Sequence, residues 1–429
     1  MERYHRRLGE AIGAAAALAL LLAGCGSSVS VSAISGAMAG TSASAVLQAR
    51  ADETPVDPAI VTADNGFGLK LLNTLISGAG GNVAISPLSV SLALQVLYNG
   101  AAGSTQQAMS QTLELGPLDT QQLNDDNAGL QASLIDPDPN VQLAIANSLW
   151  IDQAEYPVQS TFIQTDQTYY AATIGDLAGA PANVNAWVDS KTEGLIAQIL
   201  PPNLPPSEFR IAILANVLYF KGSWTTSFDS TQTAPAPFLT GGTQVSAQMM
   251  RQTGPFDYFQ GTQQGTSFQA VRIPYGQGRM SMLVVLPTVG TNLTSFLAGL
   301  DAGTLASWNA KFQSTQVALQ LPRFTASYQA SLAGALTSLG MGVVFIPREA
   351  DLSALAPGAT VSYVAHATQV EVDETGTVAA AATVVTVTPT VALPAPAQMV
   401  MDHPFFYAIQ DDATGALLFV GVMMNPAQT

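Results

Sequence analysis

The stretch that decides the fold is Val372–Met399, which reads VDETGTVAAAATVVTVTPTVALPAPAQM. It begins with acidic residues and a glycine, continues with four alanines and a β-branched run, and ends rich in proline. No charged residue occurs from Thr375 to Gln398. A β-branched run is typical of a packed strand, whereas prolines and small residues are typical of a loop. The segment therefore has the sequence features of both a loop and a buried strand.

The composition is that of a folded protein with an acidic surface. The chain has 429 residues, of which 48% are hydrophobic and 10% are charged, so it has room for one large domain or two ordinary ones. Its formal net charge is −16, and a nucleic-acid backbone would repel it. We therefore expect no nucleic-acid partner.

The first 24 residues have the pattern of an export signal. A basic start precedes an apolar run that is too short to span a bilayer, and the run ends in Leu22-Ala23-Gly24-Cys25. This tetrapeptide resembles the lipobox of bacterial lipoproteins, in which the peptide is cut before the cysteine and the thiol carries the lipid. We expect lipidation at Cys25, export, and a lipid anchor in the bacterial cell envelope with the domain outside the cytoplasm. The alternative is an ordinary signal peptide with an incidental cysteine.

The remainder divides into a tether and a domain. Residues 25–58 are rich in Ser, Ala and Gly without apolar periodicity, which indicates a flexible tether. Helical patterns cluster early in 59–429, where Asp64 is a candidate cap of the first helix, and strand patterns dominate later. That order predicts one α+β domain with large, mostly antiparallel sheets.

Motifs for an enzyme or a metal site were not found. The histidines are His5, His366 and His403, and Cys25 is the only cysteine, so a structural zinc site cannot be built. Phosphate-binding, zinc-protease and nucleophile-elbow motifs are absent from the sequence. The stretch DPDPN at 136–140 is predicted to be a solvated turn. We expect no catalytic activity, no cofactor and no metal, and a hydrogen-bonded packing role for the two later histidines.

Six segments together resemble the serpin family of serine protease inhibitors, in order and at similar spacing. They are NVAISPLSVSLAL, LANVLYFKGSWTTSFD, VRIPYGQGRMSMLVVLP, LPRFTASY, VEVDETGTVAAAAT and HPFFYAIQDDATGALLFVGVMMNP. The resemblance implies the serpin fold, with three β-sheets, about nine helices and an exposed reactive-centre loop. In this family the loop is bait for a protease, and its cleaved amino-terminal half inserts as a new strand of the main sheet. That behaviour accounts for a segment that has features of both a loop and a strand.

The resemblance assigns roles to particular residues. The hinge of the loop corresponds to Glu374, Gly376, Thr377, Ala379, Ala380, Ala381 and Ala382. A polar cluster under the point where the sheet opens, called the shutter, corresponds to Ser86, Ser89, Asn216 and His366. The site where the hinge first enters, called the breach, corresponds to Trp224 and Glu374. Counting from Gly376 at the family's usual loop length places the cleaved bond at Thr390-Val391. The segment from that bond to His403-Pro404 is about three residues longer than is usual, so positions from Thr388 to Leu393 stay open.

The resemblance also implies a partner. We expect a monomer that forms a covalent one-to-one complex with a serine protease and contacts membrane only through its lipid. The absence of Lys and Arg from 375–398 favours an elastase-like or subtilisin-like target that accepts small or β-branched residues. A non-inhibitory serpin-fold binding protein on the cell surface is the alternative. A hydrolase or adhesin with similar strand patterns is a further one.

Overall fold

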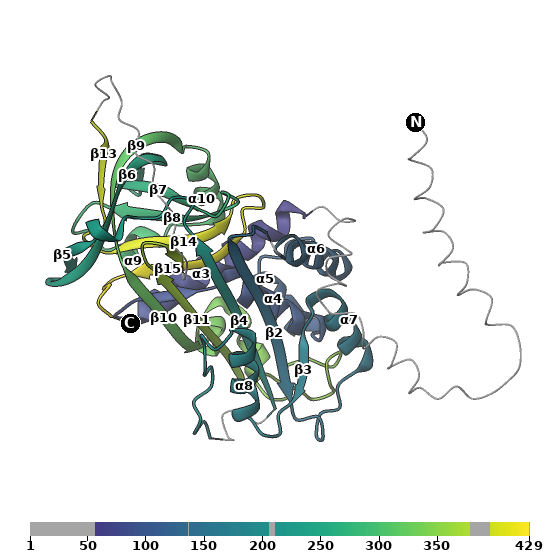
Figure 1. The fold of residues 1–429 in the computed structure, drawn as a ribbon. Coiled ribbons are helices and arrows are strands. Elements are labelled where there is room, and N and C mark those ends of the chain that lie inside the picture. Colours follow the sequence, from purple (N-terminus) through teal and green to yellow (C-terminus); the bar gives the residue numbers. More distant parts are fainter. Residues whose placement is uncertain (1–55, 136, 206–210, 378–394, 429) are drawn as a thin grey trace, which may run out of the picture. The chain divides into compact units, whose positions relative to one another are not determined.

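A computed structural model describes residues 56–135, 137–205, 211–377 and 395–428 (Figure 1). Over these residues the chain is α+β, as predicted, with nine α-helices. The helices are α3 (Pro58–Gly78), α4 (Pro87–Asn99), α5 (Gly103–Thr112), α6 (Thr120–Ser133), α7 (Ser160–Tyr170), α8 (Ala182–Lys191), α9 (Leu293–Leu297), α10 (Ala302–Asn309) and α11 (Ala333–Leu336). No helix in the described part of the chain is long and apolar enough to cross a membrane.

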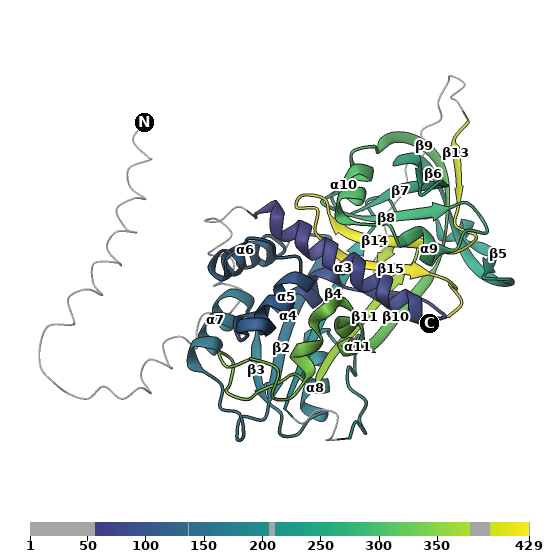
Figure 2. The same cartoon turned by 180° about the vertical axis from the view of Figure 1, so that it is seen from behind.

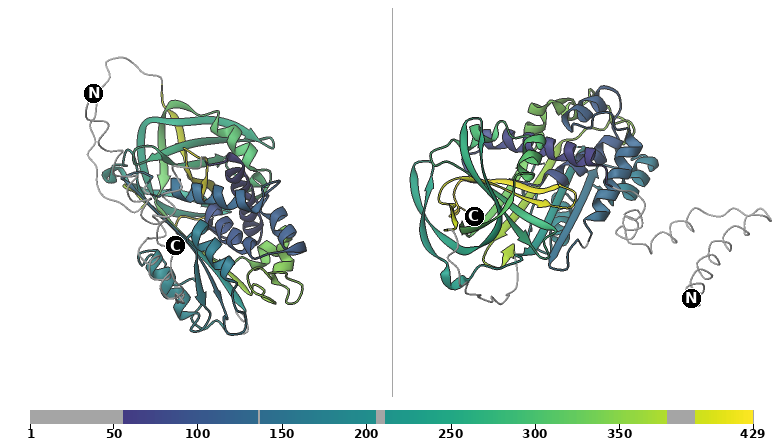
Figure 3. Two further views of the ribbon diagram at one scale, coloured as in Figure 1. Left: turned by 90° about the vertical axis from the view of Figure 1, so that its right-hand side faces the viewer. Right: turned by 90° about the horizontal axis from the view of Figure 1, so that it is seen from above.

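The first sheet has six strands, in the order β10-β11-β4-β2-β3, with β12 paired to β4. These strands are β2 (Val141–Ile151), β3 (Thr173–Asp176), β4 (Ala212–Ser223), β10 (Phe324–Ser331), β11 (Tyr363–Val372) and β12 (Gly376–Thr377). Side chains alternate between its faces. On β4, Leu214 and Leu218 face the main core, whereas Ile213, Ala215 and Val217 pack in a second cluster with residues of α8. Both faces of this sheet are therefore covered, as Figure 3 shows from the side.

The second network has nine strands, with the path β1-β15-β14-β8-β7-β6-β9-β13 and β5 paired to β6. They are β1 (Val83–Ile85), β5 (Ala234–Thr240), β6 (Thr243–Gln263), β7 (Thr266–Tyr275), β8 (Met280–Pro287), β9 (Gln313–Pro322), β13 (Ala397–Val400), β14 (Phe405–Asp411) and β15 (Leu417–Met423). Strand β6 is 21 residues long and pairs in turn with β5, β9 and β7. Two of the three expected sheets are thus hydrogen-bonded into one network, because a single long strand belongs to both.

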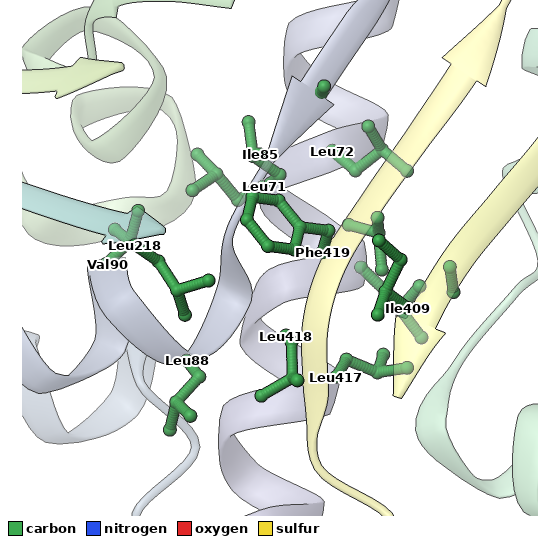
Figure 4. Packing of buried hydrophobic residues seen from close by; sticks show 14 of the residues in the cluster. Leu71, Leu72, Ile85, Leu88, Val90, Leu218, Ile409, Leu417, Leu418 and Phe419 are labelled. Atoms are coloured by element: carbon green, nitrogen blue, oxygen red, sulfur yellow. The ribbon is translucent and has the colours of Figure 1, made fainter. Parts of the chain in front are cut away.

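Helices α3 and α4 lie behind the six-stranded sheet and against β15, as Figure 2 shows. Their apolar side chains meet those of β14 and β15 in the main core (Figure 4). Helix α4 begins with Ser86 as N-cap and Pro87 in the first turn, a local start signal within the motif NVAISPLSVSLAL. The predicted cap of α3 is wrong. The cap is Asp57, which precedes Pro58, and Asp64 lies inside the helix and is buried.

Candidate functional site: the opening in the six-stranded sheet

The two central strands of the six-stranded sheet are paired over only part of their length. Tyr363–Ala367 of β11 pairs in parallel with Ile213–Val217 of β4. Strand β4 continues to Ser223 along β2, and β11 continues to Val372 along β10, without further pairs between the two. The sheet is therefore closed at one end and opened at the other, between β11 and β4.

After β11 the chain reverses direction in a tight turn over Asp373–Gly376. The Asp373 N–H donates to the carbonyl of Gly376 at 3.0 Å. Asp373 Oδ1 accepts from the N–H of Thr375 at 2.8 Å and from that of Gly376 at 3.1 Å. This arrangement, in which an aspartate bonds the backbone two residues ahead, stabilises the turn. It directs the following residues back toward the opening.

Strand β12 already lies inside the opening, against β4. Gly376 pairs with Ser223, and Thr377 pairs with Gly222, in antiparallel register. Gly376 has a φ of +148°, and a Cβ on it would lie 2.1 Å from the carbonyl oxygen of Gly222. Only glycine fits this close approach of two backbones. The hinge glycine is thus a steric requirement of the observed pairing.

The predicted breach residue Trp224 lies beside this strand. Its indole Nε1 donates to the carbonyl of Asp373 at 2.9 Å, and its ring stacks on Tyr275 with centroids 4.3 Å apart. The Tyr275 hydroxyl lies 2.9 Å from Thr377 Oγ1. Burial raises the pKa of Tyr275, so this hydroxyl stays neutral. Tyr275 was not singled out from the sequence, although it lies in the quoted motif VRIPYGQG.

The other breach residue, Glu374, is buried and held by an ion pair. Arg323 Nε donates to Glu374 Oε1 at 2.7 Å, and Arg323 Nη2 lies 2.5 Å from Oε2. Thr233 Oγ1 also donates to Oε1, and the Glu374 carbonyl accepts from the N–H of Phe228 at 2.8 Å. These contacts fasten the end of β11 to the start of β10. Arg323 was missed in the sequence analysis because nothing local marks a single arginine in LPRF as its partner.

The predicted shutter residues lie together where β4 and β11 are still paired. His366 Nδ1 is 2.8 Å from Asn216 Oδ1, and the Ser86 N–H donates to His366 Nε2 at 3.3 Å. Because Nε2 accepts, Nδ1 carries the proton and donates to Asn216. The Ser89 N–H donates to Ser86 Oγ at 3.2 Å. The cluster therefore joins the N-terminus of α4 to both central strands.

The shutter histidine is uncharged in this setting. It is fully buried, and that burial lowers its pKa to about 3. Asn147 of β2 lies directly opposite Asn216 in the β2–β4 register. Its side-chain amide is buried without a hydrogen-bond partner among the described residues. This polar neighbour was also missed, because it is the seventh residue of an ordinary strand pattern.

Other predicted residues have less to contribute here. Ala379–Ala382, the bond Thr390-Val391 and Cys25 lie outside the described residues, so their assignments stay predictions. His403 is hydrogen-bonded to Asp402 and to the carbonyl of Pro287, as a packing role requires.

Of the predicted solvated turn at 136–140 the structure describes 137–140, where Pro139 and Asn140 form an exposed turn, as predicted, whereas Asp138 is buried. The Asp138 carboxylate is 5% exposed and accepts from the N–H groups of Asn140 and Gln277. Backbone N–H groups thus provide the hydrogen bonds that this buried carboxylate needs. The local sequence does not reveal that Gln277 lies close to it. Within the described ranges, no group of three His, Cys, Asp or Glu side chains could hold a metal ion.

Comparison with known proteins identifies the family. Residues 62–426 match the family model Serpin, described as serine protease inhibitor. An uncharacterised serpin-like protein of Thermococcus kodakarensis is 33% identical over 386 residues, covering 86% of each chain. Serpin-ZXA of Oryza sativa subsp. japonica is 34% identical over 393 residues, covering 85% of this chain and 97% of its own.

Solved structures agree on the fold. The thermophilic serpin tengpin in its native state superposes with a TM-score of 0.79 at 27% identity, covering 87% of this chain and 96% of its own. Thyroxine-binding globulin in complex with thyroxine superposes with a TM-score of 0.75 at 26% identity, covering 86% and 99%. With the opened sheet and the family match over the domain, the chain belongs to the serpin family.

Proposed function

We propose that this serpin is a suicide inhibitor of serine proteases that traps the acyl-enzyme by inserting its cleaved loop between β4 and β11. The observation that carries the proposal is the pairing of Gly376 and Thr377 with the end of β4. The two central strands are apart at that end, and the turn that redirects the chain is already formed. Insertion would therefore only extend the pairing between β12 and β4 that is already present in the uncleaved chain.

The register of that pairing defines how far insertion can run. If each following residue pairs with the preceding residue of β4, Val387 arrives opposite Ala212, the first residue of that strand. The segment 376–387 then covers all 12 residues of β4. Pro389, the first proline of the loop, falls beyond the strand, where a missing N–H breaks no pair. The uncharged stretch thus matches the strand it would join.

The faces of the inserted strand also match. Thr377 contacts Tyr275 on the core side of the sheet, so alternate residues to Val387 would face the core. Thr383 would arrive opposite Asn216, beside the shutter. The intervening residues would face α8 and are alanine, valine or threonine. None brings a charge into a covered sheet, which would be costly.

The free energy that loop insertion would release is of the same order as the stability of a protease domain. Each ladder hydrogen bond contributes on the order of 1 kcal/mol net, and the new strand would add pairs to both β4 and β11. A typical protease domain is stable by only about 5–15 kcal/mol. Insertion of a whole strand is therefore comparable to the energy needed to distort a bound enzyme.

The target is proposed to accept small or β-branched residues, with cleavage at Thr390-Val391. The test is incubation with neutrophil-type elastase, subtilisin and trypsin. Expected results are an SDS-resistant one-to-one adduct with elastase or subtilisin and a large rise in melting temperature after loop cleavage. Mass spectrometry of the released fragment identifies the bond. Rapid inhibition of trypsin through cleavage within the loop would contradict the proposed specificity.

A second candidate is a non-inhibitory binding protein. It is favoured by the similarity to thyroxine-binding globulin, whose structure holds thyroxine. The same experiment separates the two functions. A loop that is cleaved without an adduct and without thermal stabilisation would support the binding protein.

We further propose that Cys25 carries lipid and anchors the exported domain to the bacterial cell envelope. The support is the lipobox-like Leu22-Ala23-Gly24-Cys25 after an apolar run. Metabolic labelling with a fatty acid, compared between the native chain and Cys25→Ser, tests it. Equal labelling of both chains would refute lipidation at this residue.

A further inference from the structure

A polar network crosses the helical layer under the six-stranded sheet. Helix α4 carries Ser91, Gln95 and Asn99 at intervals of four residues, so they lie along one side of a helix that is otherwise packed in the core. Ser91 and Gln95 are fully buried. Polar side chains at three successive turns of a buried helix require partners on its neighbours.

Two carboxyl groups supply those partners. Asp64 of α3 is 2% exposed, and its Oδ1 accepts from Ser91 Oγ and from Gln95 Nε2 at 2.9 Å. Asp166 of α7 is 0% exposed, and its Oδ1 accepts from Asn99 Nδ2 at 2.8 Å. Helix α4 is therefore hydrogen-bonded to α3 through residues in its own middle, and to α7 through its own last residue.

The oxygens of this network lack donors. Among the buried side-chain oxygens without a hydrogen-bond partner in the described residues are four of this network, Asp64 Oδ2, Gln95 Oε1, Asn99 Oδ1 and Asp166 Oδ2, and one of α6, Asn127 Oδ1. All five are acceptors. A protonated carboxyl group provides an O–H donor where a carboxylate provides none. If both carboxyls are protonated, their two O–H groups supply hydrogen-bond donors, which the unpaired oxygens lack.

In the described part of the chain, the side-chain partners of the two carboxyls are Ser91, Gln95 and Asn99, none of which is a cation. From Ala51 to Ser190 the sequence contains one basic residue, Lys70, and its ammonium group pairs with Glu114. Arg279, which donates to the carbonyl of Ser133 at the end of α6, is paired with Asp411. The basic residues that pack near these helices are thus engaged elsewhere.

The remaining titratable groups around the network are acidic. Tyr170 of α7 donates to Asn124 at 2.8 Å, and its pKa is raised well above the ordinary value by burial and then by Asp166 and Asp64. Asp125 and Asp126 are carried by α6, and burial, followed by repulsion from Asp57 and Asp125, raises the pKa of Asp126. These neighbouring acids provide no positive charge that would favour ionisation of the buried pair, and burial is the main cause of the raised pKa of both carboxyls.

We propose that Asp64 and Asp166 form a pH-sensitive latch, which holds α4 against α3 and α7 when both carboxyls are protonated and loosens when they ionise. Helix α7 lies between β2 and β3 in the sequence, so it belongs to the β4 side of the opening. Widening the opening requires that side to move relative to β11 and the helices packed behind it. Loosening the latch at higher pH would favour loop insertion, a consequence that rests on the proposed function.

The direction of the pH effect follows from burial. Burial raises the pKa of Asp64 from 3.8 to about 7, with the bonds from Ser91 and Gln95 acting in the opposite sense. Burial also raises the pKa of Asp166 well above its ordinary value, and the bond from Asn99 opposes that rise. At pH values between the ordinary and the raised pKa, each carboxyl is protonated in the folded chain and ionised in the unfolded chain. Each group thus lowers the folding equilibrium constant up to tenfold per pH unit as the pH rises.

The first test measures protonation directly and needs no protease. Infrared difference spectra of the full chain between pH 5 and pH 9 should show a protonated-carboxyl band that is lost at high pH. Asp64→Asn and Asp166→Asn should each remove part of that band, whereas Asp189→Asn, at an exposed site on α8, should not. Identical spectra for all four proteins would overturn the proposal.

The second test measures stability. The urea midpoint of Asp64→Asn minus that of the native chain should grow from pH 5 to pH 8, because the amide keeps a donor in place of the acid proton. Asp189→Asn should show no such trend. A difference that does not change with pH would refute the latch. If sodium, potassium or calcium chloride raises the native midpoint at pH 8 more than tetramethylammonium chloride at equal ionic strength, the oxygens bind a cation and the protonation model is wrong.

The third test concerns the consequence for the loop. The yield and rate of protease adduct should differ between pH 6 and pH 8 in the native chain, and Asp64→Asn should reduce that difference. No adduct at any pH would refute the proposed inhibitory function and leave the first two tests unaffected. An adduct whose rate responds equally to pH in both proteins would refute the link between latch and loop.

Discussion

Thr377 Oγ1 lies 2.9 Å from the hydroxyl of Tyr275, which places the second residue of β12 inside the sheet before any cleavage. Thr377 is 1% exposed, so whatever occupies this position must enter a dry site. Replacement by arginine would bring a charge there at a cost of several kcal/mol.

Thr377→Arg should therefore exclude β12 from the opening while the rest of the domain stays folded, and should convert the inhibitor into a substrate. Each added ~1.4 kcal/mol in the insertion barrier slows insertion about tenfold. The acyl-enzyme would then be hydrolysed before the loop has inserted. The measurement is the ratio of adduct to cleaved chain on denaturing gels. Thr377→Val, which is small and uncharged, is the matched control. Full adduct yield from the arginine variant would show that this account of the hinge is wrong.

Gly376→Ala should expel β12 from the opening. The added Cβ would lie 2.1 Å from the Gly222 carbonyl, at a φ of +148°, and such strain costs about 1–3 kcal/mol. Expulsion should change the fluorescence of Trp224, whose neighbours Tyr275 and Asp373 hold it in place. Gly334→Ala is the control, because no atom lies within 4 Å of its added Cβ. Identical spectra for both variants would argue against the observed pairing.

Glu374→Gln should weaken the fastening between β11 and β10. A hydrogen bond to a charged group contributes about 1.5–3 kcal/mol, and we expect about 1 kcal/mol here because Arg323 is 45% exposed and its charge is screened. The expected outcome is a lower urea midpoint of the uncleaved chain. Arg323→Lys should give a smaller loss, since lysine keeps the charge without the two-point geometry. Unchanged midpoints would mean that the pair has no structural effect.

The shutter histidine predicts a pH dependence of the opposite sign to that of the buried acids. Its folded pKa of about 3 lies below the ordinary value of 6.5, so between those values the unfolded chain binds the extra proton. Stability from this group is complete above pH 6.5 and is lost as the pH falls, by up to about 1.4 kcal/mol per unit.

His366→Gln should remove that dependence, which is read as the difference in urea midpoint from the native chain between pH 7 and pH 4. Asp64 is present in both the native chain and the variant, so its own pH dependence cancels in this difference between midpoints. His403→Gln, at a histidine outside the opening, is the control. If the two variants respond alike to acid, His366 is not the group responsible.

Thr383→Val tests the proposed register. Insertion would separate Asn216 from His366, which are 2.8 Å apart in the uncleaved chain, and would place Thr383 between them. Its hydroxyl can bond either side chain, and we expect its loss to lower the stability of the cleaved form by about 1 kcal/mol. The uncleaved form should be unaffected. Melting temperatures of both forms check this, and Thr386→Val, on the opposite face, should be neutral in each.

Much of the fold and part of the site could be predicted from local patterns. Ser86-Pro87 marks the start of a helix wherever it occurs, because the serine side chain and the proline φ act within one turn. Asp64 shows the limit of such reasoning, since a capping residue type before an apolar run is equally compatible with a helix interior. The buried partners Ser91 and Gln95 on the next helix decide between them.

From the sequence alone, the order and spacing of the motifs pointed to the serpin family, and the hinge after Glu374 could be seen to be small and uncharged. The resemblance to that family also implied that Asn216 and His366 belong to one cluster. Motif order, side-chain size and charge are properties of residues along the chain, whereas the cluster of Asn216 and His366 was implied only by the resemblance. Only the tertiary structure decided how far the hinge enters the sheet, that Arg323 binds Glu374, and that Asp64 and Asp166 share one α4 network. Those contacts join residues from 31 to 102 positions apart. Their energies depend on burial and distance, which exist only once the strands and helices have packed.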